Sequence, residues 1–541
     1  MTTDRTVDPT TGDLAAHFRE HGYWDDSTLV SFLDHWAGIQ PEHAYVSDGR
    51  GAYTYGGFRD AAWQLSAALL DLGAEPGDRI AVQLSNWNEF FLVYAANARV
   101  GIVTIPVVPV YREKEVRHIL ANSGAVGFVT SGVFRGFDHA AMAASIAADL
   151  PSLRFRVIVR GEATDGAVAF DDLLAATQDL STLPPAPTAD DRHVILYSSG
   201  TEANAKGCLH TWNSASFLPK QAVAALGMTT DDVMFMPSPV THALGLTLGV
   251  MAPTVAGAAV HLLDVFDPAE ALRRIGEHGC TGTASPAPFI RMMLDAYDPA
   301  EHDVSKLRFW LSAGAAIPGS LVTEAAEKFA GCRVVSAYGS SEVMMATICR
   351  PEDSVERVAT SDGAPVPGVQ VRIVGADGAE APTGEPGEIR YRGPGRLVEY
   401  WDDPSLTAAA IDDDGWWRTG DLGKVDADGY LRVTGRLKDI IIRGGFNISA
   451  REIEEALLTH PAVANVAVVG LPDPQLGEKA CAVLQLRPGA TIHLAELKDF
   501  LAGQHKLAVW KVPERIEVVD DFPTTATGKI KKFALRDRYG V

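Results

Sequence analysis

The chain has 541 residues, of which 47% are hydrophobic, so it is long enough for at least two domains of ordinary folded composition. Its 47 basic and 69 acidic residues give a net charge of -22, which argues against nucleic acid and anionic membranes as partners. The five cysteines lack metal-ligand spacing, and the polar start MTTDRTVDPTTGDL has no apolar signal-peptide core. We therefore expect a cytoplasmic protein.

The first part of the chain alternates helix and strand patterns. Helical spacing of alanine, leucine and aromatic residues predicts helices over 60–72 and 88–100, separated by a β-like run at 79–84. An alanine-rich stretch at 139–148 predicts a further helix, and an apolar strand is expected at 194–197. This alternation is typical of an α/β protein.

Residues 243–263 are almost uncharged and long enough in principle to span a bilayer. Glycines and a proline interrupt them, so a buried helix followed by a buried strand is the better prediction. The next helix is expected to start at Pro268, with Asp267 as its cap and Glu270 completing a capping box.

The composition of the sequence changes towards the C-terminus, where turn residues become frequent. Turn-rich β segments predict a β-rich subdomain at about 360–435. A shorter unit then begins, with a helix opened by Ser449 and Glu452 in capping-box spacing. Strands near 463–469 and 481–486 and a helix at 494–501 predict a compact α+β domain. We expect an N-terminal domain over 1–437 and a C-terminal domain over 438–541.

Five stretches carry the residue types that a nucleotide requires. The glycine-rich stretch YSSGTEANAKG (197–207) supplies amides, hydroxyls and a lysine for phosphate, although no Walker pattern can be aligned there. YGSSE (338–342) offers an aromatic face, hydroxyls and a carboxylate for Mg²⁺, and GWWRTGD (415–421) ends in an aspartate that suits ribose. GRLKD (435–439) and TGK (527–529) add basic groups. Taken singly, each stretch is explained equally well as a polar turn, a flexible loop or a solvated side chain.

In this order the five stretches resemble the adenylate-forming superfamily of acyl-CoA ligases, luciferases and peptide-synthetase adenylation domains. PVTH (239–242), SAGAA (312–316) and GEPGE (384–388) agree, so the resemblance covers nearly the whole chain. Residues 209–211 and 239–245 are most similar to medium-chain and cyclohexanecarboxylate-type CoA ligases. The resemblance implies an α/β fold with a large multi-sheet N-terminal domain and a small mobile α+β C-terminal domain.

The resemblance also implies a two-step reaction. A carboxylate attacks ATP to give acyl-AMP and pyrophosphate, and the thiol of coenzyme A then displaces AMP. Lys529 would bridge the acyl carboxylate and the phosphate, Glu342 would bind Mg²⁺, and His242 would line the acyl pocket, unless it is simply a packed imidazole. The remaining nucleotide contacts implied by the family are Ser199, Gly200, Thr201, Lys206, Gly314, Ala315, Ala316, Tyr338, Gly339, Ser341, Asp421 and Arg436.

For the second step, the family pattern places a hinge at Lys438. Rotation of the small domain would withdraw Lys529 and bring Arg443, Gly444 and Gly445 towards coenzyme A.

The glycine-rich stretch departs from the family pattern at Ser198, Glu202, Ala203 and Ala205, the last replacing a proline. A Glu202 carboxylate roughly 5 Å from a phosphate would be repelled by about 3 kcal/mol. An alanine forced into a left-handed conformation would add about 1–2 kcal/mol. If the carboxylate turned to solvent and the loop shifted, the penalty would almost vanish.

Several functions therefore stay open. The main prediction is a complete acyl-CoA ligase, and small residues (Ala243, Gly245, Ala284 and Gly314) suggest room for a bulky or cyclic acid. An alternative is an enzyme that only thioesterifies an acyl-adenylate made by a partner ligase. Luciferase-like oxygenation, loading of a carrier protein, and a non-catalytic nucleotide-binding protein are further alternatives. The alanine-rich composition suits a role in specialised metabolism by analogy alone.

Overall fold

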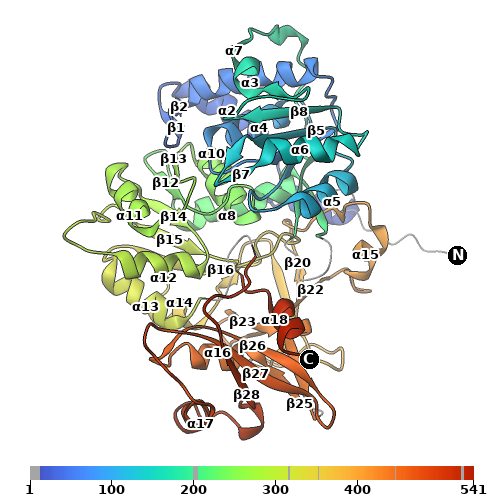
Figure 1. Cartoon of the computed structure of the whole chain (residues 1–541). Coiled ribbons are helices and arrows are strands. Elements are labelled where there is room, and N and C mark those ends of the chain that lie inside the picture. Colours follow the sequence, from blue (N-terminus) through green and yellow to red (C-terminus); the bar gives the residue numbers. More distant parts are fainter. Residues whose placement is uncertain are drawn as a thin grey trace, which may run out of the picture.

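The structure is a computed structural model that describes residues 12–198, 205–314, 317–350, 352–444, 446–525 and 529–540. The predicted contacts Ser199, Gly200, Thr201, Ala315, Ala316 and Gly445 lie outside these residues, as do Glu202 and Ala203. In Figure 1 the N-terminal sheets and helices (blue to green) form the upper part, and the C-terminal sheet (orange to red) lies below them.

Two large sheets, each mainly parallel, dominate the upper part. The eight-stranded sheet has the order β21 (Glu399–Tyr400), β11 (Gly207–Thr211), β10 (Arg192–Tyr197), β4 (Val103–Pro106), β3 (Arg79–Gln83), β5 (Gly127–Ser131), β8 (Phe155–Val159) and β9 (Val168–Ala169). The nine-stranded sheet has the order β18 (Ala364–Pro365), β17 (Thr347–Ile348), β16 (Arg333–Tyr338), β15 (Phe309–Ser312), β14 (Gly282–Ala284), β12 (Val233–Met236), β13 (Ala259–Leu262), β1 (Ala44–Ser47) and β2 (Ala52–Thr54).

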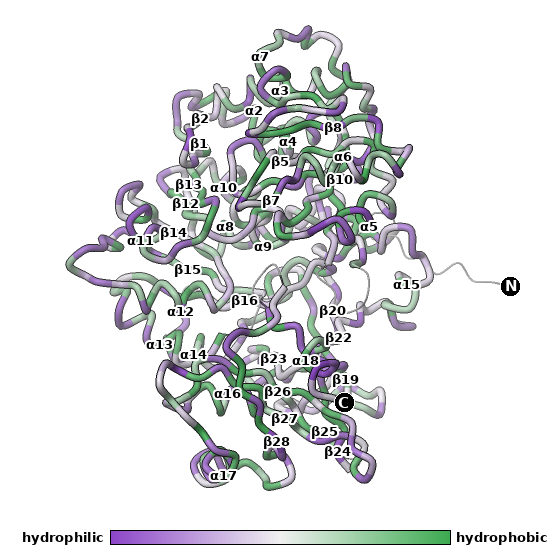
Figure 2. Tube along the Cα trace, viewed as in Figure 1, coloured by the Kyte–Doolittle hydropathy of each residue, from purple (hydrophilic) through white to green (hydrophobic). Residues whose placement is uncertain are grey.

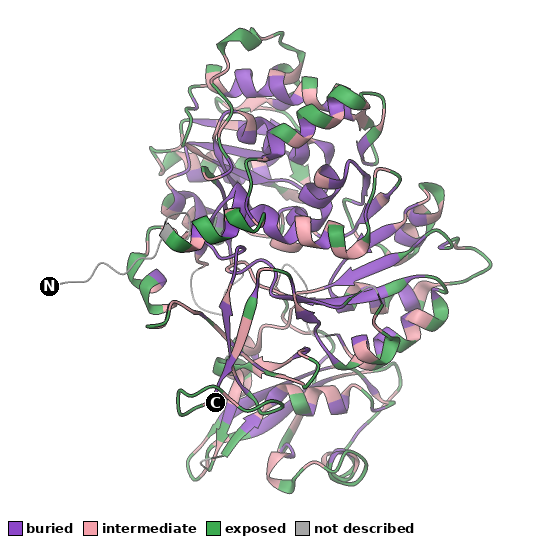
Figure 3. Ribbon diagram, turned by 180° about the vertical axis from the view of Figure 1, so that it is seen from behind, coloured by how far each residue is buried: buried purple, intermediate pink, exposed green. Residues whose placement is uncertain are grey.

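The helices packed on these sheets complete two hydrophobic clusters, a large one and a smaller one between the eight-stranded sheet and residues 116–146. Helix α4 (Asn88–Arg99) is buried along almost its whole length, as expected for a helix that is apolar on all sides. It packs against α3 (Tyr55–Asp71), and the same core includes α8 (Trp212–Leu226). Figure 3 shows this burial in the strands and central helices, and Figure 2 shows that the apolar residues gather in the same elements.

A smaller antiparallel sheet follows the two large ones. It runs β19 (Gln370–Val374), β20 (Gly387–Arg392), β22 (Trp417–Val425) and β23 (Leu431–Arg436), in agreement with the turn-rich β pattern of the sequence. In the C-terminal part the order is β25 (Phe446–Ser449), β24 (Ile440–Arg443), β27 (Gly477–Leu486) and β26 (Val463–Asp473), with β28 (Arg515–Val518) beside β27. This sheet has its own apolar clusters, which include residues of α16 (Ala450–Leu457), α17 (Leu494–Asp499) and α18 (Lys532–Tyr539).

Most predicted elements are confirmed. The segment 243–263 forms α9 (Ala243–Gly245), the π-helical turn η2 (Leu246–Met251), α10 (Ala252–Ala256) and then β13. The alanine-rich stretch is α6 (His139–Ala148). Among the helices of the described part of the chain, none combines the length and apolar character needed to cross a bilayer.

Both predicted capping boxes are only half right. Asp267 and Ser449 accept hydrogen bonds from the backbone N–H groups of Glu270 and Glu452, which caps α11 (Pro268–Glu277) and α16. The glutamate side chains have other partners, however. Glu270 pairs with two arginines of its own helix, and Glu452 pairs with Lys511, because charge-assisted bonds outcompete a return bond to a neutral amide.

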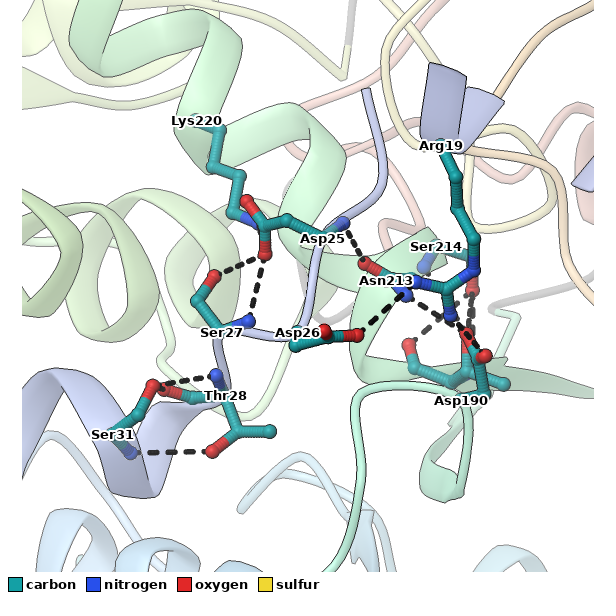
Figure 4. A network of polar contacts seen from close by, with 11 residues as sticks. Arg19, Asp25, Asp26, Ser27, Thr28, Ser31, Asp190, Asn213, Ser214 and Lys220 are labelled. Atoms are coloured by element: carbon teal, nitrogen blue, oxygen red, sulfur yellow. Dashed lines mark hydrogen bonds and ion pairs between the residues drawn. The ribbon is translucent and has the colours of Figure 1, made fainter. Parts of the chain in front are cut away.

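A polar network ties the N-terminal segment to α8 (Figure 4). Lys220 Nζ on α8 lies 2.9 Å from Asp25 Oδ1, and the backbone N–H of Asp25 donates to Asn213 Oδ1 on the same helix at 3.1 Å. Asn213 in turn donates to Asp190 at 2.8 Å, and Arg19 of α1 (Gly12–Glu20) pairs with Asp190. Since α8 follows directly on β11, this network fixes the helix that leaves the glycine-rich stretch.

Candidate active site

Strand pairing and one side-chain hydrogen bond bring three predicted residues together at one end of the site. Asp421 on β22 and Arg436 on β23 are register partners and form an ion pair, with Arg436 Nε 2.9 Å from Asp421 Oδ1. Tyr338, at the end of β16, donates its hydroxyl to Asp421 Oδ2 at 2.7 Å. The Asp421 side chain is only 9% exposed. The hydrogen bond from Tyr338 holds the aromatic ring in a fixed position relative to the carboxylate. Each carboxylate oxygen still has a lone pair that can accept from a ligand hydroxyl.

These residues line a cavity of about 240 Å³ between the N-terminal sheets and the C-terminal part. Gly314 and Gly339 also line it, for different reasons. A Cβ on Gly339 would lie 1.8 Å from the Met344 carbonyl oxygen, so no side chain fits there. A Cβ on Gly314 would meet nothing within 4 Å, and its φ of +81° is one that glycine adopts readily. Gly314 therefore leaves open space at the cavity wall.

Lys529 enters the same cavity from the C-terminal part of the chain. Its backbone N–H donates to Thr525 Oγ1 at 3.1 Å, and its carbonyl accepts from the Thr525 N–H at 2.7 Å, which fixes the base of the side chain. Burial and the positive charge of Arg436 lower the pKa of Lys529 to about 8, while Asp421 and Glu342 act in the opposite direction. The amine is therefore a cation in a strongly charged site, close to losing its proton at neutral to mildly basic pH.

His242 lies within electrostatic reach of this lysine. Burial, and then the charge of Lys529, lower the pKa of His242 to about 3, so its imidazole is neutral at physiological pH. It sits immediately before α9 and the π-helical turn η2, a local geometry frequent at functional sites.

A second group of contacts holds the 338–342 motif. The Tyr400 hydroxyl donates to Glu342 Oε1 at 3.1 Å. The Ser341 carbonyl accepts from His210 Nε2 at 2.7 Å, and His210 Nδ1 lies 3.0 Å from Ser214 Oγ. A carbonyl can only accept, so Nε2 carries the proton and Nδ1 accepts from the serine. Burial lowers the pKa of His210 to about 4, which keeps this arrangement neutral.

The end of the glycine-rich stretch forms an exit limb, residues 205–207. The Ser198 N–H donates to the Lys206 carbonyl at 2.9 Å, and the Trp401 N–H donates to the Gly207 carbonyl at 2.7 Å. Lys206 Nζ lies 6.0 Å from the centre of the Tyr400 ring. Tyr400 thus touches both Lys206 and Glu342.

Other predicted residues lie elsewhere. Gly444 has a φ of +56° and donates its N–H to the Leu476 carbonyl at 2.7 Å, and Arg443 pairs with Glu514; neither lines the cavity. Lys438 is exposed in the short helix η3 (Leu437–Asp439), where the chain passes from β23 to β24. Gly245 is small because of packing and not because of an acyl group, since a Cβ there would lie 2.1 Å from the Pro239 carbonyl oxygen.

Three features of the site were not predicted from the sequence. They are Tyr400, the hydrogen bond from His210 to the Ser341 carbonyl, and an ion pair of 2.7 Å between Glu454 and Lys532 at the cavity wall. For Tyr400, the sequence offers one indication, the pair of adjacent aromatic residues Tyr400 and Trp401 close to the turn-rich region.

The donor set also decides what kind of metal fits. Within the described ranges no group of three or more His, Cys, Asp and Glu side chains could hold a metal ion. A single carboxylate, Glu342, suits Mg²⁺, which is usually bound through one or two carboxylates together with substrate phosphates.

Comparison with known proteins shows the family to which this chain belongs. Residues 33–401 match the family described as AMP-binding enzyme, and residues 452–529 match the AMP-binding enzyme C-terminal domain. A medium-chain fatty-acid–CoA ligase from Escherichia coli (strain K12) is 36% identical over 96% of this chain and 92% of its own length. A salicylyl-CoA synthase / salicylate adenylyltransferase from a Streptomyces species is 32% identical over 97% of this chain and 96% of its own.

Solved structures show the same fold. ATP-bound MatB from Rhodopseudomonas palustris superposes with a TM-score of 0.85 at 28% identity, covering 95% of this chain and 99% of that one. The anthranilate CoA ligase AuaEII in complex with anthranoyl-AMP gives a TM-score of 0.86 at 26% identity, covering 95% of this chain and 97% of that one. The chain therefore belongs to the AMP-binding enzyme family, the adenylate-forming enzymes. It is an acid–thiol ligase of the AMP-forming acyl-CoA synthetase class, which uses ATP, Mg²⁺ and coenzyme A.

Proposed function

We propose that this chain is a complete ligase, which adenylates a bulky or cyclic carboxylic acid and then transfers the acyl group to coenzyme A. The observation that carries the proposal is the position of Lys529, which lies in one cavity with Tyr338, Asp421 and Arg436 although its own support comes from the C-terminal part of the chain. Burial lowers the pKa of this lysine, and perturbed ionisable groups in a cavity are typical of functional sites, which supports a role beside the negative charge of a bound substrate.

In the first half-reaction the Tyr338 ring would stack on adenine, and Asp421 with Arg436 would hold the ribose. The acid's carboxylate oxygen forms a bond to the α-phosphorus, and the bond from that phosphorus to the bridging oxygen breaks to release pyrophosphate. The Lys529 cation offsets the charge that accumulates as the two anions approach. Ser341 would touch the α-phosphate and Lys206 the outer phosphates. Glu342 would hold Mg²⁺, which neutralises phosphate charge when bound.

For the second half-reaction we propose a rotation of residues 438–541 about Lys438 relative to residues 1–437. The thiolate of coenzyme A attacks the acyl carbonyl, a C–S bond forms, and the C–O bond to AMP breaks. Two observations support the rotation. Arg443 and Gly444 lie off the cavity in the present arrangement, and their neighbours Ile442 and Phe446 are 57% and 58% exposed. These exposed apolar side chains flank Arg443 and Gly444, the predicted coenzyme A contacts, and the rotation would bury them against the N-terminal domain.

Two features support a bulky or cyclic acid as the substrate. Gly314 leaves open space at the cavity wall, and His242, a neutral imidazole, would line the acyl pocket. Relatives named for salicylate and anthranilate, together with the medium-chain ligase, are consistent with a ring or an alkyl chain in this space.

A split assay tests the proposal. Acid-dependent release of pyrophosphate from ATP is followed for a panel of medium-chain, alicyclic and aromatic acids, beside thioester formation from the matching synthetic acyl-adenylates and coenzyme A. Both signals with the same acid support a complete ligase. Thioester without pyrophosphate would reject adenylation by this chain and would require a partner ligase, and nucleotide binding without either signal would reject an enzymatic role.

A further inference from the structure

We infer that His118 is a positioning residue for adenylation, which holds the exit limb of the glycine-rich stretch in place where the family pattern has a proline. The inference rests on the proposed function of Lys206 as a phosphate contact. It concerns a residue outside the motif, on helix α5 (Glu113–Ser123).

The contact itself is specific. His118 Nε2 lies 3.0 Å from the Ala205 carbonyl oxygen, and since a carbonyl only accepts, the imidazole donates. This bond crosses from α5 to the residue directly before Lys206, so it fixes the peptide group from which the lysine side chain departs.

The imidazole is itself held in place. Its ring meets the Tyr197 ring edge to face, with centroids 6.5 Å apart and an angle of 86° between the planes. The Tyr197 hydroxyl donates to Asn122 Oδ1 at 2.6 Å, and Trp401 Nε1 donates to the Asn122 carbonyl at 3.2 Å. Tyr197 begins the glycine-rich stretch and Trp401 follows Tyr400. One turn of α5, from His118 to Asn122, therefore contacts the start of the stretch, its exit limb and the segment 400–401.

The brace matters because the limb has room to move. A cavity of about 450 Å³ opens beside it, lined by His118, Asn122, Lys206, Tyr400, Trp401 and Leu406 among others. With alanine at 205 in place of a rigid proline ring, the backbone before Lys206 gains freedom in φ. The backbone bonds of Lys206 and Gly207 restrain the far end of the limb, and the bond to His118 restrains its near end.

The test compares His118→Phe, which keeps the ring but removes the donor, with His118→Gln, whose amide can still donate. Lys114→Ala, an exposed position one turn earlier on α5, is the matched control. We expect His118→Phe to lower acid-dependent pyrophosphate release about 10-fold or more, because small displacements of positioned groups reduce rates by that order. His118→Gln should stay within about 3-fold of the unaltered enzyme, and thioester formation from the synthetic acyl-adenylate should be unchanged in both. A loss of both half-reactions in His118→Phe, or no rescue by glutamine, would overturn the inference.

Binding separates this inference from the proposed function. Affinities for ATP and for AMP are measured by calorimetry on the same variants. We expect His118→Phe to weaken ATP binding several-fold while AMP binding stays constant, because only ATP carries the outer phosphates. This readout needs no turnover, so it stands even if the unaltered chain does not adenylate any acid. Equal losses for ATP and AMP, or none for either, would show that His118 does not position the phosphate contact.

Discussion

The two ends of the active site are built in different ways. At the ribose end, Asp421 and Arg436 are fixed by the register of adjacent strands. The buried Asp421 carboxylate already accepts a hydrogen bond from Tyr338 and forms an ion pair with Arg436. At the phosphate end, the segments that carry Lys206 and Glu342 are held by side chains of separate elements. His118 contacts the Ala205 carbonyl, His210 contacts the Ser341 carbonyl, and Tyr400 donates to Glu342. A sheet register tolerates little change, whereas contacts between separate elements can be exchanged one at a time. This difference explains how the glycine-rich stretch can depart from its family pattern while the ribose end keeps its residues.

The largest effect is expected for Lys529→Ala, because the proposed role of this lysine is to reach the phosphate end from the C-terminal part of the chain. Loss of the cation should lower the rate of acid-dependent pyrophosphate release by about 10²–10³ or more. Thioester formation from a synthetic adenylate should change far less, since the proposed rotation withdraws Lys529 for that step. Lys498→Ala, an exposed lysine of α17, should leave both rates unchanged. Equal loss of both half-reactions would contradict a role confined to the first.

Asp421→Asn tests the ribose end. The amide removes the charge that pairs with Arg436, and hydrogen bonds to charged groups contribute about 1.5–3 kcal/mol. We expect binding of AMP to weaken about 10- to 100-fold, and both half-reactions to slow together because both need the nucleotide held. Calorimetry with AMP and the split assay measure these effects. A defect confined to adenylation would show that Asp421 belongs functionally to the phosphate end.

His210→Leu should have a smaller effect, confined to the phosphate end. The Ser341 carbonyl would lose its buried donor, an unsatisfied group worth about 1–3 kcal/mol of unfolding free energy. Denaturant unfolding measures this loss, and the split assay should show a slower first half-reaction with an unaltered second. His210→Gln should restore much of both if its amide reaches the same carbonyl. Unchanged stability in the leucine variant would mean that water satisfies Ser341.

The motif residues of the ribose end could be predicted from the sequence, but the side chains that hold the phosphate end could not. Tyr338, Asp421 and Arg436 stand in short motifs that carry the family resemblance, and the structure brings them together although 83 residues separate Tyr338 from Asp421. The partners of the phosphate end come from far along the chain. His118 and Ala205 are 87 residues apart, and His210 and the Ser341 carbonyl are 131 apart, so only the tertiary fold reveals these contacts. The capping boxes are only half formed for a related reason, because charged side chains pair with the glutamates that local spacing had assigned to the helix ends.

The smallest expected effect concerns the pH dependence of the first half-reaction. It tests whether charged groups at both ends of the site shift the pKa of Lys529. The pKa of Lys529 is lowered to about 8, and the cation is the active form, so the rate should be level below that pH and fall as the pH rises through it. His242 has a pKa of about 3 and that of Tyr338 is raised well above its ordinary value, so neither titrates in this range.

Two variants should then move the falling limb of the pH profile in opposite directions. Arg436→Gln removes a positive neighbour, so the pKa of Lys529 should rise and the limb should shift to higher pH. Glu342→Gln removes a negative neighbour, so the limb should shift to lower pH. Both variants will be slower overall, but the position of the limb is independent of the absolute rate. The value of kcat/KM for ATP, taken from pyrophosphate release between pH 6 and about 10, gives that position, because kcat/KM reports the ionisation of the free enzyme. Shifts in the same direction would show that the lysine does not sense the two ends of the site through their charges.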